Sequence, residues 1–122
     1  MNSEDFVERI KLYVRDAAVE DSISKLGKPP GRKPRQRHLN QSEWYNKLSE
    51  ENKIMLKSII EEAVDESLFG FLAVLDGVRV IEDGQNRGTL ELNYQNKSEK
   101  ILLNNPDEEY LHDIYNSLTN KE

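Results

Sequence analysis

The sequence predicts an α+β domain built around one long central helix. Three observations carry this prediction. Residues 49–75 form the longest segment in which apolar side chains recur at helical spacing. Apolar and polar residues alternate between positions 78 and 103, as they do in strands. Amphipathic segments at both ends of the chain can cover the central helix, so we expect helices packed with a small antiparallel sheet.

The first helix is expected to start near Ser3, where Glu4 and Asp5 would lie at the positive end of the helix dipole. Its buried stripe would comprise Phe6, Ile10, Val14, Ala17 and Ala18. Gly27, just ahead of two prolines, is a typical end signal. One face of this helix can therefore cover the central helix.

Residues 27–40, with the sequence GKPPGRKPRQRHLN, are predicted to form a basic loop rich in proline and glycine. Prolines fix the backbone φ angle and lack an N–H donor, so regular structure is disfavoured here. A short helix over residues 41–48 should follow and pack Trp44 and Tyr45 inward.

The central helix is predicted from Ser49, its N-cap, to Leu75. Its first half is amphipathic, whereas residues 68–75 are apolar on every side and should be covered all round. Asp76-Gly77 either closes this helix through a left-handed glycine or forms the turn of a β-hairpin. We favour the helix end, because the helical periodicity continues up to this point.

The remaining residues predict a three-stranded antiparallel meander followed by a C-terminal helix. The strands are expected at residues 78–82, 89–94 and 101–103, separated by turn residues. Asn105-Pro106 followed by two acids is a strong helix-start signal. The buried stripe of this last helix would comprise Leu111, Ile114, Tyr115 and Leu118.

Length and composition indicate one domain over residues 1–122. The chain has no cysteine, which excludes disulfides and thiolate chemistry and favours an intracellular setting. No apolar run reaches the roughly 18 residues that a membrane span requires, and the first residues lack a basic signal-peptide region. We expect a cytoplasmic protein that does not bind membranes.

The net charge of -6 hides a marked asymmetry. Residues 25–38 contain six basic and no acidic side chains, so the rest of the chain carries 11 basic and 23 acidic residues. A basic loop on an acidic body can pair with that body, with an acidic partner or with nucleic acid. The candidate binding residues in the loop are Lys28, Arg32, Lys33, Arg35 and Arg37.

Residues 31–35, Gly-Arg-Lys-Pro-Arg, are similar to the Arg-Gly-Arg-Pro core of AT-hook peptides, which lie in the minor groove of A·T-rich DNA. They depart from it because Lys33 separates Arg32 from Pro34 and no arginine precedes Gly31. Pairing with the acidic body, or plain solvation, is the favoured alternative. A third possibility is that an SH3-like partner recognises the prolines of the loop.

The central helix carries four closely spaced acids, Glu61, Glu62, Asp65 and Glu66, which form two like-charge pairs at i, i+4 spacing. Such a face is a weak candidate for holding magnesium. A second set of carboxylates is not evident, so a solvated face is favoured. Glu109 and His112 have the Glu-x-x-His spacing of di-iron bundles without the rest of that motif, and His38 has no spaced partner.

No G-x-S-x-G motif and no phosphate-binding glycine loop occurs. We therefore identify no catalytic residues, no metal site and no cofactor, and the sequence leans away from an enzyme without deciding the matter.

The segments PPGRKP, SEWYNKLS, FGFLAVLDGVRVIEDG and LNNPDEEYLHD resemble a family of small uncharacterised bacterial proteins. The resemblance covers most of residues 20–115. It implies a single bacterial domain and carries over no site residues.

The sequence thus favours a non-enzymatic binding or regulatory protein that recognises a macromolecular partner. A protein partner comes first, and an inhibitor or immunity-type role is one version of it. A DNA-associated accessory protein that uses the basic loop is the alternative, and a metal-dependent hydrolase on the central-helix acids is the third. The partner's identity and the oligomeric state are beyond the sequence.

Overall fold

The computed structural model describes residues 1–120 and combines helices with a small two-stranded antiparallel sheet. Its elements in order are α1 (Ser3–Ile10), the π-helix η1 (Lys11–Asp16), α2 (Ala17–Gly27), α3 (Gln36–Asn46), α4 (Glu50–Leu75), β1 (Asn93–Gln95), β2 (Lys100–Leu102) and α5 (Leu111–Thr119). The predicted α+β class is confirmed. In the part of the chain described, no helix combines the length and apolar character needed to cross a bilayer.

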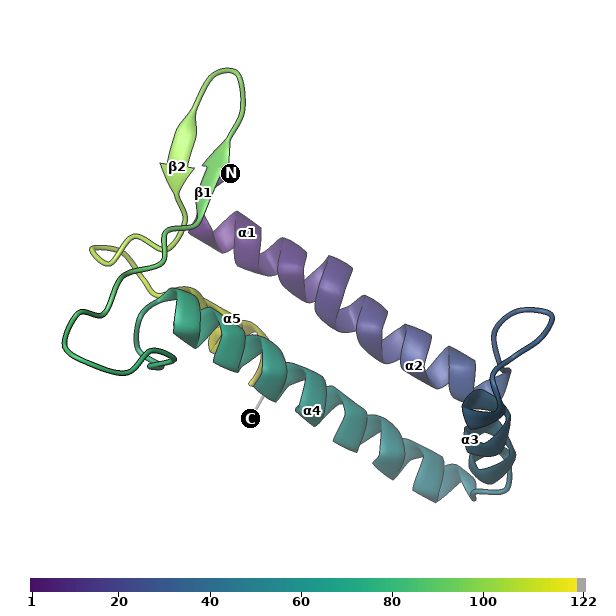
Figure 1. The fold of residues 1–122 in the computed structure, drawn as a ribbon. Helices are drawn as coiled ribbons and strands as arrows, with labels where there is room; N and C mark the ends of the chain where they lie inside the picture. Colours follow the sequence, from purple (N-terminus) through teal and green to yellow (C-terminus); the bar gives the residue numbers. More distant parts are fainter. Residues whose placement is uncertain (121–122) are drawn as a thin grey trace.

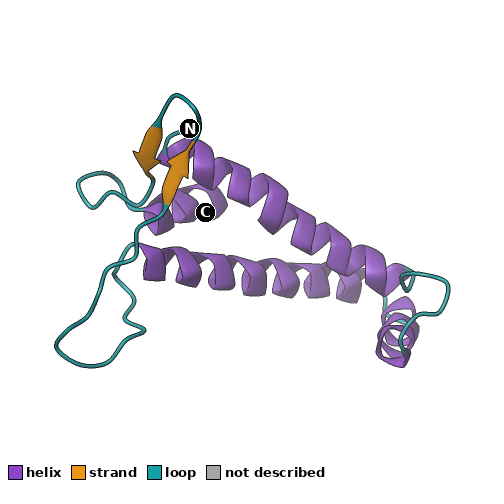
Figure 2. Ribbon diagram, turned by 45° about the horizontal axis from the view of Figure 1, so that its top comes forward, coloured by secondary structure: helices purple, strands orange, loops and turns teal. Residues whose placement is uncertain are grey.

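Two long helical rods dominate the fold (Figure 1). α1, η1 and α2 run on as one rod, which we call the N-terminal rod, and α4 forms the second. α3 links the two rods at one end, where it packs on α2 (Figure 2). At the opposite end α5 contacts both α1 and α4, next to the β1–β2 hairpin.

The apolar core lies at the α5 end of the rods. Its buried residues are Val7, Leu72, Leu111, Ile114 and Tyr115. They come from α1, α4 and α5, so the core joins the N-terminus, the centre and the C-terminus of the chain. Towards the α3 end the rods bury few apolar side chains.

The N-terminal rod begins at Ser3, where the sequence predicted the helix start. Asn2 is the N-cap, because its side chain accepts from the Asp5 N–H (2.8 Å) in a capping box. Ser3 is instead buried, and its hydroxyl donates to the Leu103 carbonyl oxygen (2.8 Å). The predicted end at Gly27 is confirmed.

The π-helical segment η1 breaks the predicted apolar stripe of this rod. A π-turn contains more residues than an α-turn, so it rotates the side chains that follow. Val14, predicted to be buried, is exposed, and the neighbouring Arg15 turns towards α4. A prediction that assumes the α-helical repeat along the whole rod cannot anticipate this rotation of the side chains.

The basic loop is shorter than predicted, because residues 36–40 already belong to α3. Trp44 is not packed inward as expected, since its side chain is 54% exposed, whereas Tyr45 and Ser42 are buried. The cause is the way α3 docks on the end of α2. Asn46 donates to the Gly27 carbonyl oxygen (3.2 Å) and Ser42 lies beside it, which turns the Trp44 face outward.

The boundaries of α4 are close to those predicted. The Ser49 hydroxyl accepts from the Asn52 N–H (3.1 Å), and Gly77 has a left-handed φ of 78° just after the helix. The helix-end interpretation is therefore confirmed, and the hairpin alternative is wrong. The expectation that residues 68–75 are covered on every side is wrong at Phe71, which is 60% exposed.

The sheet has two strands rather than three. β1 pairs antiparallel with β2, with Tyr94 opposite Ile101. Residues 78–82 do not form the predicted strand, because the Val78 and Arg79 N–H groups both donate to the Ala73 carbonyl oxygen at the end of α4. These donors are thus committed to the helix end and cannot enter a ladder.

The last helix starts at Leu111, later than predicted. Asn105 does form a local cap, since its side chain accepts from the Asp107 N–H (3.0 Å), but the result is a single turn. The buried positions Leu111, Ile114 and Tyr115 are confirmed. Leu118, the fourth predicted position, is only partly buried.

The left-handed conformation of Gly77 gives a test of the α4 end. Gly77→Ala should lower the free energy of unfolding by about 1–2 kcal/mol, because a Cβ disfavours positive φ. Gly27→Ala is the matched control, since Gly27 lies within α2 and an added Cβ would meet nothing. Urea denaturation measures both. Equal stability of the two variants would contradict the assigned helix end.

Candidate functional site

A polar network holds the middle of the two rods together. Arg15 of η1 donates to both carboxylate oxygens of Asp65 on α4, at 2.9 and 3.1 Å. The Arg15 Nη2 atom that donates to Asp65 also donates to the carboxylate of Glu61, at 3.2 Å. The arginine is largely buried, so this two-pronged pairing is shielded from water.

Tyr115 of α5 completes the network. Its hydroxyl donates to Asp65 Oδ1 at 2.6 Å, so one carboxylate connects η1, α4 and α5. Burial raises the pKa of Tyr115 above its ordinary value, and the hydrogen bond to Asp65 raises it further. The hydrogen bond to Asp65 likewise raises the pKa of Arg15. Both groups therefore hold their protons, which suits a structural connection.

Asp16 adds a second carboxylate on η1 itself. It pairs with Arg15 (3.0 Å) and Lys11 (3.2 Å). Burial opposes its ionisation, but the hydrogen bonds from Arg15 and Lys11 prevail and lower the pKa of Asp16. The π-helical turn therefore brings Arg15 between carboxylates of its own rod and of α4.

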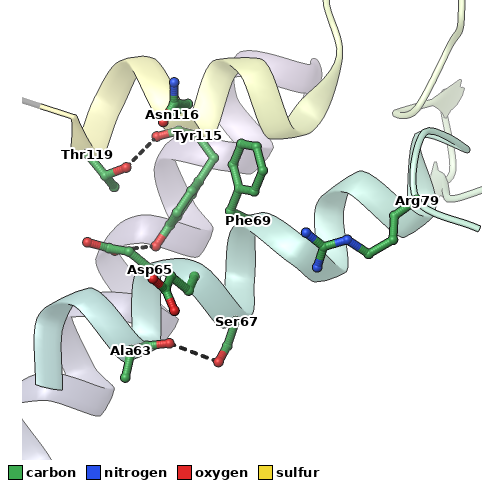
Figure 3. A pocket seen from close by; sticks show the side chains of 9 residues that line it. Ala63, Asp65, Ser67, Phe69, Arg79, Tyr115, Asn116 and Thr119 are labelled. Atoms are coloured by element: carbon green, nitrogen blue, oxygen red, sulfur yellow. Dashed lines mark hydrogen bonds between the residues drawn. The ribbon is translucent and has the colours of Figure 1, made fainter.

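A cleft of about 700 Å³ lies beside this network, between α4 and α5 (Figure 3). Phe69, Arg79 and Tyr115 line it together with Asp65. Its hydroxyl groups are already used, because Ser67 donates to the Ala63 carbonyl oxygen (2.9 Å) and Thr119 to that of Tyr115 (2.9 Å). The third hydroxyl that lines the cleft, that of Tyr115, donates to Asp65 (2.6 Å). Burial and this hydrogen bond raise the pKa of Tyr115, which disfavours the ionised form that nucleophilic catalysis requires.

Arg79 lies across α4 at the edge of this cleft. Its guanidinium sits over Gly70, where a Cβ would overlap it. The absence of a side chain at position 70 therefore lets the segment after α4 fold back onto the helix.

The four acids of α4 do not share one site. Asp65 and Glu61 face Arg15, whereas Glu62 and Glu66 are exposed on another side of the helix. No group of three or more histidine or acidic side chains within residues 1–120 is placed to hold a metal ion. Sequence spacing alone could not find the role of Asp65, because its partners lie 50 residues away on either side.

His112 and Asp76 form a buried pair that the sequence did not reveal. Asp76 Oδ2 lies 2.6 Å from His112 Nδ1 and accepts from the His112 N–H (2.9 Å), so Asp76 caps α5 from the end of α4. His112 contacts Phe69 edge-on and stacks on Tyr110. The side chain of His112 is only 12% exposed.

This pair lacks the third member of a catalytic triad. His112 Nε2 lies 3.4 Å from a carboxylate oxygen of Asp113, where a triad needs a hydroxyl nucleophile. Asp76 Oδ1 is buried with no hydrogen-bond partner among the described residues. Glu109 precedes α5, so the Glu-x-x-His spacing does not fall on one helix.

The basic loop projects from the α3 end of the molecule (Figure 1). The five predicted binding residues are all exposed: Lys28, Arg32, Lys33, Arg35 and Arg37. Over the described range none of them forms an ion pair, so the loop does not pair with the acidic body. These cations are available to another molecule.

Trp44 extends this surface onto α3. Arg37 and Trp44 are seven residues apart, which places them on the same face of a helix, and both are exposed. We call the surface formed by the five cations and Trp44 the basic tip. The charges of this surface are apparent from the sequence, whereas Trp44 was predicted to pack inward.

Asp65 gives a direct test of the polar network. Asp65→Ala should lower the free energy of unfolding by about 1.5–3 kcal/mol, because it removes a charged hydrogen-bond acceptor and leaves Arg15 and Tyr115 without it. The exposed neighbour Glu66→Ala should change it by less than about 0.5 kcal/mol. Chemical denaturation measures the free energy of unfolding of both variants. A similar cost at both positions would show that the network does not hold the rods.

Comparison with family models, curated proteins and solved structures finds no significant match to this chain. The arrangement of the side chains is therefore the basis for assigning a function.

Proposed function

We propose that the protein is a non-enzymatic binding protein that recognises an acidic surface of a partner protein through the basic tip. The observation that carries this proposal is the group of five exposed cations that form no ion pair within residues 1–120, next to the exposed Trp44. Tryptophan and arginine are the residue types that most often dominate binding energy at protein interfaces.

The charge distribution supports a partner of this kind. The tip is basic, whereas the remainder of the chain is strongly acidic, so the molecule has two oppositely charged regions. Such a field orients an approaching acidic protein towards the tip and speeds association. Arg32, Arg35 and Arg37 can also bind carboxylates in a two-pronged manner, which fixes the register of the complex.

DNA binding by the loop is the second candidate, and two observations make it weaker. Gly31 adopts a φ of 80°, so the chain turns immediately before Arg32, whereas minor-groove peptides are extended. The acidic body would also repel the phosphates that flank a bound site. We therefore place an acidic protein ahead of DNA.

The two candidate reaction centres also favour binding over catalysis. In the cleft, the Ser67 and Thr119 hydroxyls donate to their own helices, and the Tyr115 hydroxyl holds its proton in the bond to Asp65. Both ring nitrogens of His112 lie next to carboxylates. A hydrolase that uses magnesium would need Asp65 as a ligand, but Arg15 and Tyr115 already use it.

The test is affinity capture from the lysate of the encoding organism, with wild type and the Arg32→Ala/Arg35→Ala/Arg37→Ala variant in parallel. We expect the wild type to retain one stoichiometric protein with an acidic surface, released by raised ionic strength, and the variant to lose it. Lys97→Ala/Lys100→Ala is the matched control, since it removes two exposed lysines from the distant hairpin.

Capture of the same protein by the triple variant would contradict the proposal. A gel-shift measurement with an A·T-rich duplex checks the alternative, because a shift lost in the triple variant would favour DNA. If the captured partner is an enzyme, its activity in the complex decides whether the chain acts as an inhibitor.

A further inference from the structure

The chain exposes far more surface than a monomer of its size should. Its accessible surface is 9196 Å². A compact monomer of 14.2 kDa is expected to expose about 6,800 Å². The excess is about 2,400 Å², a large area relative to the ~800 Å² that each partner contributes to a standard protein interface.

Much of the exposed apolar surface lies on the two rods. On α4, Ile54, Met55 and Ile59 are 71%, 61% and 54% exposed. On η1, Leu12 and Tyr13 are 56% and 67% exposed, and Val14 follows them. We call these groups the α4 patch and the η1 patch. Burial of apolar side chains such as these is the main driving force of most protein association.

The architecture leaves these patches without a covering layer. A domain normally packs two layers of secondary structure around its core. Here α5 supplies that cover only at its own end of the rods, next to the buried core. Over the α3 half the rods form a single layer, as the views in Figures 1 and 2 show.

A second copy of the chain fits this surface in area and in charge. The exposed loop over residues 77–91 accounts for part of the excess, but if each copy buries only about a third of it, the interface already totals about 1,600 Å², the size of a standard stable interface. The exposed Arg9, one turn before Tyr13, can pair with Glu51 or Glu62, the exposed acids that flank the α4 patch, whereas the exposed Glu8 next to it has to lie outside that contact. In a two-fold dimer, the α4 patch of one copy can meet the η1 patch of the other, and the symmetry forms this contact twice.

We infer that the protein is a homodimer in which the α4 patch and the η1 patch of two copies cover each other. The dimer brings four long rods together, as in a four-helix bundle made from two helical hairpins. The basic tip, on the loop and the outer face of α3, takes no part in this interface. The inference therefore stands apart from the proposed function.

Light scattering coupled to size exclusion tests the inference on the full chain. Wild type should have twice the mass of the 14.2 kDa chain. Ile59→Glu should raise the dissociation constant of the dimer roughly 100-fold or more, because it would bury an unpaired carboxylate. Leu90→Glu, at an exposed apolar residue outside the rods, is the control and should leave the dimer intact.

If the wild type is monomeric at a protein concentration of roughly tens of micromolar, the inference is overturned, whatever the variants do. A dimer that survives Ile59→Glu unchanged would also overturn it. Circular dichroism establishes that the variant is folded, and Ile59→Ser replaces it if the charge prevents folding. The Arg32→Ala/Arg35→Ala/Arg37→Ala variant should stay dimeric, so loss of partner binding and loss of dimerisation can be told apart.

Discussion

Within residues 1–120, the buried apolar cluster that the two long rods share lies at the α5 end, and this constraint shapes the rest of the molecule. At the α5 end, Leu72, Leu111 and Tyr115 are buried together. In the middle, the Arg15–Asp65 pair takes the place of apolar packing. At the far end, α3 closes the two rods without covering them. Polar and ionic contacts therefore help to hold the rods together away from the core, and much of the apolar surface of the rods remains exposed.

The elements that could be predicted were those defined by local chemistry. α4 is determined by the Ser49 cap, by the apolar periodicity that follows and by Gly77, which adopts a positive φ. These three residue signals lie in one continuous stretch of sequence. The errors arose where distant contacts decide the outcome. The π-turn shifts Val14 outward, the docking of α3 on α2 turns Trp44 outward, and the fold-back after Gly77 removes the first predicted strand.

The functional features, too, could be predicted where their residues are close in sequence and not where distant contacts form them. The cations of the basic tip are close in sequence, so their charge was apparent without a structure. The Arg15–Asp65–Tyr115 network and the Asp76–His112 pair join residues from different helices, and no spacing rule connects them. The structure also changes the meaning of the central-helix acids, because Asp65 serves as a structural acceptor and not as a member of a carboxylate site.

The central claim is that the apolar faces of the rods are buried in solution by another copy of the chain. Amide hydrogen exchange followed as a function of protein concentration tests it most directly. We predict that the amides around residues 54–62 become more protected as concentration rises, while those at the α5 end of α4 stay equally protected at every concentration. Exchange around residues 54–62 that is fast and independent of concentration would contradict the claim.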